Sequence, residues 1–191
     1  MSVQLWTVLI PLKRLEAAKT RLRGALPGVP HDDLVLALAR STVAAARQSP
    51  LVRRTAVITN QSGLDAETIP DLHGDLNEAI REAARLVTGP VAVIPADLPA
   101  LRPQELTEAL ALAEQRSFVP DTEGTGTVLL ACPKGLLDPR FGPGSALRHE
   151  QSGAVRLHGA WPTLRRDVDT AADLAAVEAL GWRHAGHGLR V

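Results

Sequence analysis

Short apolar runs rich in strand-forming residues alternate along this chain with longer amphipathic stretches, and this alternation constrains the fold more than any other feature. The apolar runs predict buried strands over residues 5–11, 54–59 and 91–95. Between and after them, helical patterns occupy residues 30–49, 75–88 and 103–116. Strands and helices of these lengths in alternation imply βαβ units, with helices covering both faces of a largely parallel sheet.

The second half of the chain adds shorter elements. Two strands predicted over residues 117–120 and 127–132 lie too close in sequence for a helical crossover, so part of the sheet should be antiparallel. Further elements are expected as a short helix over 144–151, strands over 154–157 and 164–169, and a helix over 170–180. We expect residues 1–191 to form a single three-layer α/β domain with a mostly parallel, mixed sheet.

Composition narrows the classes of protein. With 191 residues, 45% of them hydrophobic, the chain can bury the core of one domain. A formal net charge of zero argues against a general nucleic-acid or membrane-surface binder. The single cysteine, Cys132, lies in an apolar run and predicts a small buried side chain rather than a disulfide or zinc site. The first apolar run is too short for a membrane span or a signal peptide, so the expected location is the cytoplasm.

Two glycine- and hydroxyl-rich segments are candidates for anion binding. In the first, Gly124 and Gly126 alternate with Thr125 and Thr127 after an acidic tripeptide. Successive backbone N–H groups in such a loop can form a concave anion site, although a polar hairpin connection has the same composition. The second segment, Gly142-Pro143-Gly144-Ser145, is of the same chemical type.

Three aspartates are candidate metal ligands. Asp97 follows the strand over 91–95, and ligands of open α/β sheets bind beyond the carboxyl ends of strands. A turn or helix cap is the alternative role. Asp167 and Asp169 would share one face of a strand, where two like charges need a compensating cation such as Mg²⁺. Asp169 could also cap the final helix. Together the three carboxylates suffice for one or two Mg²⁺ ions.

The densest basic stretch follows the first strand and is a candidate phosphate site. Lys13 and Lys19 are its strongest members, because lysine is otherwise rare in this chain. Arg21 is a further candidate, whereas Arg14 and Arg23 also fit a solvated helix face. The chain has no P-loop and no dinucleotide-binding glycine motif after its first strand.

Two further polar positions accompany these segments. Asn77 could hydrogen-bond a base or ribose at a loop-to-helix junction, while Asp75 is expected to cap that helix. His149 is the one histidine near the candidate site, and no nucleophile–base arrangement is evident.

Taken in order, these motifs resemble a known family. The segments that carry the resemblance span almost the whole chain: Val8-Leu9-Ile10-Pro11-Leu12-Lys13, Lys19-Thr20-Arg21-Leu22, Gly74-Asp75-Leu76-Asn77, Pro95-Ala96-Asp97-Leu98-Pro99, Gly124-Thr125-Gly126-Thr127, Phe141-Gly142-Pro143-Gly144-Ser145 and Asp167-Val168-Asp169-Thr170. They are similar to the CofC/FbiD guanylyltransferases of coenzyme F420 biosynthesis. The resemblance implies a nucleotidyltransferase fold related to GT-A glycosyltransferases and molybdopterin guanylyltransferases. It also implies transfer of GMP from GTP to phosphoenolpyruvate or 2-phospho-L-lactate, with release of pyrophosphate.

The resemblance also assigns roles to residues. It implies that Thr127, Gly142 and Ser145 bind the phosphorylated acid and that the three aspartates bind Mg²⁺. The acceptor phosphate is already anionic, so the reaction needs alignment and charge neutralisation rather than a general base. Lys13, Lys19 and Asp97 are then the expected catalytic groups. Lys13, Lys19, Arg21 and Asn77 are the expected nucleotide contacts. Val128 departs from the family pattern, which often has asparagine there.

Two alternatives remain open at this stage. Another nucleotidyltransferase of the same fold usually carries a glycine-rich loop after its first strand, where this chain has Pro11-Leu12-Lys13. A catalytically inactive nucleotide-binding domain would have less need of three aspartates. The expected partners are GTP and a phosphorylated three-carbon acid, with a homodimer as a further candidate and with neither nucleic acid nor membrane.

Overall fold

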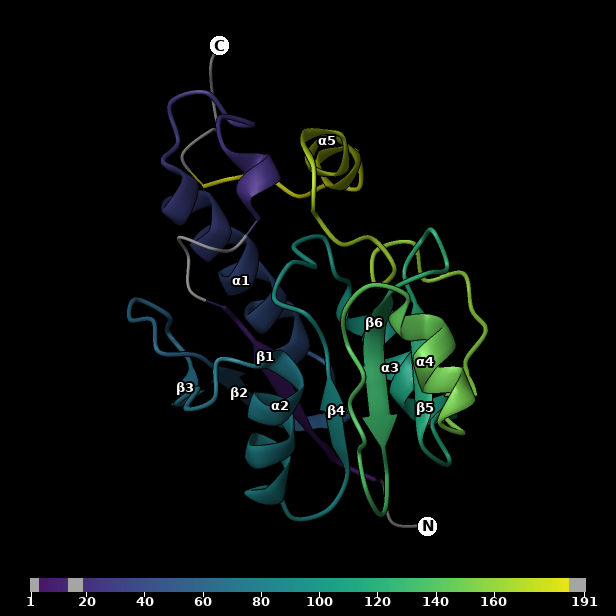
Figure 1. Ribbon diagram of the computed structural model, residues 1–191. Coiled ribbons are helices and arrows are strands. Elements are labelled where there is room, and N and C mark those ends of the chain that lie inside the picture. Colours follow the sequence, from purple (N-terminus) through teal and green to yellow (C-terminus); the bar gives the residue numbers. More distant parts are fainter. Residues whose placement is uncertain (1–3, 14–18, 186–191) are drawn as a thin grey trace.

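One seven-stranded sheet organises the computed structural model, which describes residues 4–13 and 19–185 (Figure 1). The strands are β1 (Trp6–Pro11), β2 (Val52–Ile58), β3 (Glu67–Ile69), β4 (Val91–Val93), β5 (Ser117–Pro120), β6 (Thr127–Cys132) and β7 (Val155–Arg156). Their order is β3-β2-β1-β4-β6-β5-β7. Only the pairings of β6 are antiparallel among the described strands, which confirms a mostly parallel, mixed sheet.

Helices cover both faces of this sheet. Side chains alternate between the faces along β1, so that Val8 and Ile10 join one core cluster and Leu9 the other. The first cluster packs under α1 (His31–Arg47) and α3 (Pro103–Leu112), and the second under α2 (Leu76–Arg85) and α4 (Ser145–Gln151). A third cluster joins the start of α1 to α5 (Ala171–Ala179) and the short 3-10 helix η2 (Thr20–Leu22). The expected three-layer arrangement is therefore confirmed.

Two elements differ from the expectation. β3 is an additional strand that pairs with β2 at the edge of the sheet. The strand expected over residues 164–169 is wrong, because this segment is irregular. Scattered hydrogen bonds rather than a sheet ladder hold it. The Glu105 carboxylate accepts hydrogen bonds from the Thr163 and Leu164 N–H groups, each at 2.9 Å. Further along, the Arg165 carbonyl oxygen accepts one from the Thr122 N–H at 2.9 Å.

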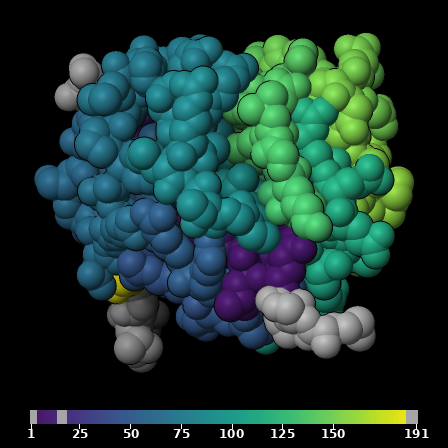
Figure 2. Space-filling view, turned by 90° about the horizontal axis from the view of Figure 1, so that it is seen from below, coloured from purple at the N-terminus to yellow at the C-terminus, as the bar shows by residue number. Residues whose placement is uncertain are grey.

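The topology gathers polar side chains at one edge of the sheet. The carboxyl ends of β1, β4 and β5 lie at this edge, and the reversed strand β6 begins there (Figure 1). Figure 2 looks onto the opposite end of the molecule, where β1 begins (purple). Loops that leave the carboxyl edge therefore build the candidate site. Within the described residues, no helix combines the length and apolar character needed to cross a membrane.

Candidate active site

A cleft of about 610 Å³ opens at the carboxyl edge of the sheet. Its volume lies within the range of roughly 300–1,000 Å³ that is usual for small-molecule sites. The structure brings together in its lining all but one of the predicted site residues, namely Lys13, Lys19, Arg21, Asp97, Thr127, Gly142, Ser145, Asp167 and Asp169. Segments far apart in sequence thus meet at a single site.

Asp97 is held at the cleft by a buried hydrogen-bond network. The Thr42 hydroxyl, on α1, accepts a hydrogen bond from the Leu98 N–H at 3.0 Å and lies 3.2 Å from the Ala96 carbonyl oxygen. The Asp97 carboxyl is buried, and its Oδ1 atom has no hydrogen-bond partner among the described residues. The alternative role as a helix cap is wrong, because the N-cap of α3 is Arg102.

Asp167 and Asp169 reach Asp97 without the predicted strand. The Val168 N–H, between them, donates a hydrogen bond to the Asp97 carbonyl oxygen at 3.1 Å. Carboxylate oxygens of the three aspartates lie within 4.8 Å of one another. Asp169 does not cap α5, since the N-cap is Thr170, which forms a capping box with Asp173. None of the three aspartates caps a helix, so all three carboxylates can bind a ligand in the cleft.

Charge in this acidic cluster is partly balanced by Lys19. Its ammonium forms ion pairs with Asp97 and Asp169. Burial alone would lower the pKa of Lys19, but these two carboxylates outweigh it and raise that pKa above its ordinary value. Burial raises the pKa of Asp97, an effect that Lys19 opposes. Burial, Asp97 and Asp169 together raise the pKa of Asp167 to about 7. The three aspartates therefore carry more negative charge than the Lys19 ammonium balances.

The donor set fits a hard divalent cation. Carboxylate oxygens are the preferred ligands of Mg²⁺, and the buried Oδ1 atom of Asp97 lacks a partner. A lysine ammonium between two of the carboxylates shows that the site accepts a cation. The aspartate cluster could therefore bind a metal ion.

The first glycine-rich loop differs from the expected anion cradle. The Asp121 carboxylate accepts hydrogen bonds from the N–H groups of Thr125 and Gly126, at 2.9 and 2.8 Å. These N–H groups are consequently engaged by the chain's own carboxylate. A Cβ atom at position 126 would overlap Asp121 Oδ2 unless that carboxylate moved. At the end of the loop, Thr127 lines the cleft.

The second glycine-rich segment is positioned by Asn77. The Asn77 amide accepts a hydrogen bond from the Phe141 N–H at 2.7 Å and donates one to the Phe141 carbonyl oxygen at 3.1 Å. The next residue, Gly142, has a φ of 120°, which side-chain-bearing residues rarely adopt. Asn77 is the one predicted site residue that does not line the cleft. The expected cap is confirmed, because the Asp75 side chain accepts a hydrogen bond from the Glu78 N–H.

The basic stretch contributes exposed groups at the cleft. Lys13 and Arg21 are both exposed and line it, whereas Arg14 lies outside the described residues. Sequence reasoning did not identify Asp121 and Phe141 as lining residues. For Asp121 a signal existed, because it follows a buried strand as Asp97 does. For Phe141 only the neighbouring glycine segment pointed to the cleft.

The mostly parallel sheet with one reversed strand and a cleft at its carboxyl edge is similar to the fold of solved nucleotidyltransferases. A nucleotidyl transferase from Methanothermobacter superposes with a TM-score of 0.60 at 15% identity, covering 92% of this chain and 97% of that one. CMP:2-keto-3-deoxy-manno-octonic acid synthetase complexed with CTP gives a TM-score of 0.56 at 17% identity, covering 93% and 98%. At such low identity these similarities show the fold alone.

Sequence relatives define the family. The model of the family described as guanylyl transferase CofC like matches residues 6–177, and the chain belongs to this family. A phosphoenolpyruvate guanylyltransferase from Salinispora arenicola is 50% identical, covering 93% of this chain and 90% of the relative. One from Geodermatophilus obscurus is 51% identical, covering 95% and 92%. The family resemblance predicted from the motifs is confirmed.

Proposed function

We propose that this protein transfers GMP from GTP to phosphoenolpyruvate and releases pyrophosphate, with 2-phospho-L-lactate as the second candidate acceptor. The observation that carries the proposal is one cleft lined both by the aspartate cluster with Lys19 and by the two glycine-hydroxyl segments. The first set suits a polyphosphate with its cation, and the second suits a small anionic acid. The curated relatives bear the name of this activity.

The nucleotide side of the cleft would be formed by the aspartate cluster and by the cationic side chains around it. Asp97, Asp167 and Asp169 would hold Mg²⁺, which when bound neutralises phosphate charge and orients the phosphates for in-line displacement. Lys13, Lys19 and Arg21 line the same cleft and would bind the triphosphate and then stabilise the leaving pyrophosphate. Because Lys19 is paired with two aspartates, it would exchange carboxylate oxygens for phosphate oxygens when the nucleotide enters.

The acid side would be formed by hydroxyl and backbone groups. Thr127 and Ser145 are buried side chains that line the cleft, with Gly142 beside them. Hydrogen-bond donors held in a fixed array stabilise an anion without reorganising at the moment of reaction. Asn77, whose amide is engaged by Phe141, would support this acid site through the loop; its predicted contact with the nucleotide stays a prediction.

The chemical step follows from these positions. An oxygen of the acceptor phosphate attacks the α-phosphorus of GTP, a new P–O bond forms, and the bond to the β-phosphate bridging oxygen breaks. The electron pair leaves with pyrophosphate. The nucleophile is anionic near neutral pH, so no side chain has to remove a proton. The protein's task is to align two polyanions and neutralise their charge.

Pyrophosphate release tests this function. Purified protein is incubated with Mg²⁺, GTP and each acid in turn, and parallel reactions replace GTP by CTP. We expect release with GTP and phosphoenolpyruvate, and less or none with CTP. Release with CTP in preference to GTP would indicate another nucleotidyltransferase of this fold. The absence of release with both acids and both nucleotides would favour an inactive nucleotide-binding domain.

The wider setting is also part of the proposal. The product would enter coenzyme F420 biosynthesis, as the family resemblance implies, and the expected location is the cytoplasm. A homodimer stays a prediction, which the molar mass in solution measured by light scattering would test.

A further inference from the structure

His149 is buried between the two sides of the acid site and is held at both ring nitrogens. It lies on α4, and its side chain is fully buried. Nδ1 lies 2.9 Å from the Thr127 hydroxyl oxygen, while Nε2 accepts a hydrogen bond from the Arg140 N–H at 2.9 Å. The Phe141 ring packs edge-on against it, with the ring centroids 5.2 Å apart. The ring thereby ties β6 to the second glycine segment.

The bond to Arg140 determines where the imidazole proton lies. A backbone N–H can donate only to a nitrogen with a free lone pair, so Nε2 carries no hydrogen. The imidazole is then neutral, with its hydrogen on Nδ1, and Nδ1–H donates to the Thr127 hydroxyl oxygen. Thr127 consequently acts as an acceptor toward His149. Its own hydroxyl hydrogen remains available for an acceptor in the cleft, which Thr127 lines.

The surroundings favour this neutral form. Burial lowers the pKa of His149, and the charges of Arg116, Arg148 and Arg140 lower it further, while Asp138 opposes them. The resulting pKa is about 4, well below neutral pH.

We propose that His149 is a positioning residue that holds the Thr127 hydroxyl as a hydrogen-bond donor toward an anionic oxygen of the acceptor acid. This inference rests on the proposed function, which places the acid at Thr127. With the opposite tautomer, the Thr127 hydroxyl would donate its hydrogen to His149 Nδ1 and would present only lone pairs to the anion. Donation to a charged oxygen is among the stronger hydrogen bonds in proteins, so the difference affects acid binding directly.

The tautomer can be measured without reference to activity. Long-range proton–nitrogen NMR spectra of protein with ¹⁵N-labelled histidine distinguish Nδ1–H, Nε2–H and the imidazolium form. We expect a neutral His149 with Nδ1 protonated at pH 7, unchanged at pH 5.5. An Nε2–H tautomer or an imidazolium at pH 7 would overturn the proposal, whether or not the protein transfers GMP.

Two amide variants separate the two hydrogen bonds of His149. His149→Asn places an amide donor where Nδ1 lies, so it can still donate to Thr127. His149→Gln places its amide near Nε2, so it can still accept from the Arg140 N–H but loses Thr127. We expect His149→Gln to raise the KM for the acid about tenfold or more, given the usual worth of a hydrogen bond to a charged group. His149→Asn should raise it less, and neither variant should change the KM for GTP.

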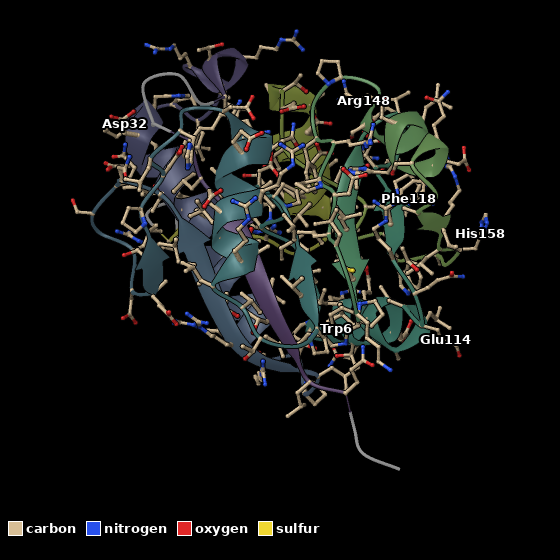
Figure 3. The ribbon with its side chains drawn as sticks, turned by 60° about the horizontal axis from the view of Figure 1, so that its bottom comes forward. Trp6, Asp32, Glu114, Phe118, Arg148 and His158 are labelled. Carbon is tan, nitrogen blue, oxygen red and sulfur yellow. The ribbon has the colours of Figure 1, made fainter. Side chains whose placement is uncertain are left out.

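Controls distinguish positioning from a structural role. Exposed His158, at the outer edge of the molecule in Figure 3, provides the matched substitution His158→Gln, which should leave both KM values unchanged. Equal effects of His149→Asn and His149→Gln on both KM values would overturn the proposal. Thermal melting of each variant verifies that it is folded.

A double-mutant cycle tests whether His149 acts through Thr127. Thr127→Val removes the hydroxyl, so adding His149→Gln to this variant should not raise the KM for the acid any further. Additive increases would show that His149 acts by another route and would overturn the proposal. Absence of GMP transfer in the wild-type protein would instead refute the proposed function and leave the tautomer measurement valid.

Discussion

Lys19 forms an ion pair with Asp97 inside the cleft, and the same ammonium also pairs with Asp169. Its nitrogen therefore competes with any metal ion for carboxylate oxygens of the acidic cluster. This relationship links the basic stretch after β1 to the loop after β4.

Removing the ammonium should destabilise the metal-free protein and strengthen its response to metal. In Lys19→Gln, three neighbouring carboxyl groups lose their balancing charge, which should cost about 2 kcal/mol of unfolding free energy. Mg²⁺ should then stabilise the variant more than the wild type, because ligands that bind only the folded state add stability. Urea unfolding with and without Mg²⁺ measures both effects. Lys13→Gln, at an exposed lysine, is the control, and equal Mg²⁺ responses in all three proteins would contradict the prediction.

Asp97→Asn should abolish turnover while the fold persists. The asparagine has nearly the same shape but lacks the charge, so we expect at least a roughly 100-fold fall in kcat. Pyrophosphate release and circular dichroism test the two parts. The matched control is Asp65→Asn, at an exposed aspartate that does not line the cleft, and it should leave kcat within about twofold. A wild-type rate in Asp97→Asn would remove this residue from the metal site.

Gly126→Ala should destabilise the first glycine-rich loop through overlap with Asp121. The added Cβ atom meets Asp121 Oδ2, and such overpacking typically costs about 1–3 kcal/mol. In the Asp121→Ala background the obstructing carboxylate is gone, so the same substitution should cost less. Urea unfolding of the two single variants and the double variant measures this coupling. Additive losses would show that the overlap does not cause the effect.

His149 should contribute stability that increases with pH between about pH 4 and 6.5, while the raised pKa of Asp167 contributes with the opposite sign. Its pKa is lowered from 6.5 to about 4 in the folded protein, so the unfolded chain binds the proton first as pH falls. This shift of the His149 pKa corresponds to about 3 kcal/mol of unfolding free energy. The contribution is fully present above pH 6.5 and is lost by about pH 4.

The measurement for this prediction is the urea midpoint as a function of pH in wild type and His149→Gln. Between pH 4 and 6.5 the slope of the variant should be less positive than that of the wild type, whatever its stability at pH 7. Identical slopes would mean that His149 does not contribute to the pH dependence.

Asn77→Ala should distinguish loop support from nucleotide binding. The side chain holds Phe141 next to Gly142, so its loss should raise the KM for the acid by about fivefold or more. The KM for GTP should stay unchanged if support of the loop is its role. Steady-state kinetics with each substrate varied in turn decide the matter, since a rise confined to the KM for GTP would support the original nucleotide-binding prediction.

Local sequence patterns predicted most of the fold. Alternating apolar runs located β1, β2, β4, β5 and β6, and helical periodicity located the helices. β3 escaped prediction because its Glu67-Thr68-Ile69 sequence is polar and mostly exposed at the edge of the sheet, whereas the equally short β4 is apolar and buried. The segment over 164–169 was wrongly predicted as a strand because its pattern does not show that its backbone bonds to the Glu105 carboxylate and to the Asp97 carbonyl oxygen instead of a neighbouring strand.

The sequence by itself determined the α/β class, the family and the residue types that line the cleft, because these depend on periodicity and on motifs of contiguous residues. Tertiary structure alone decided how those residues are used. Asp121 occupies the N–H groups of its own loop, Lys19 balances the acidic cluster, and Asn77 holds Phe141. The tertiary structure likewise decided that His149 bonds to Thr127 and Arg140. Most of these contacts join groups on different elements, and which donor meets which acceptor depends on how the whole chain packs.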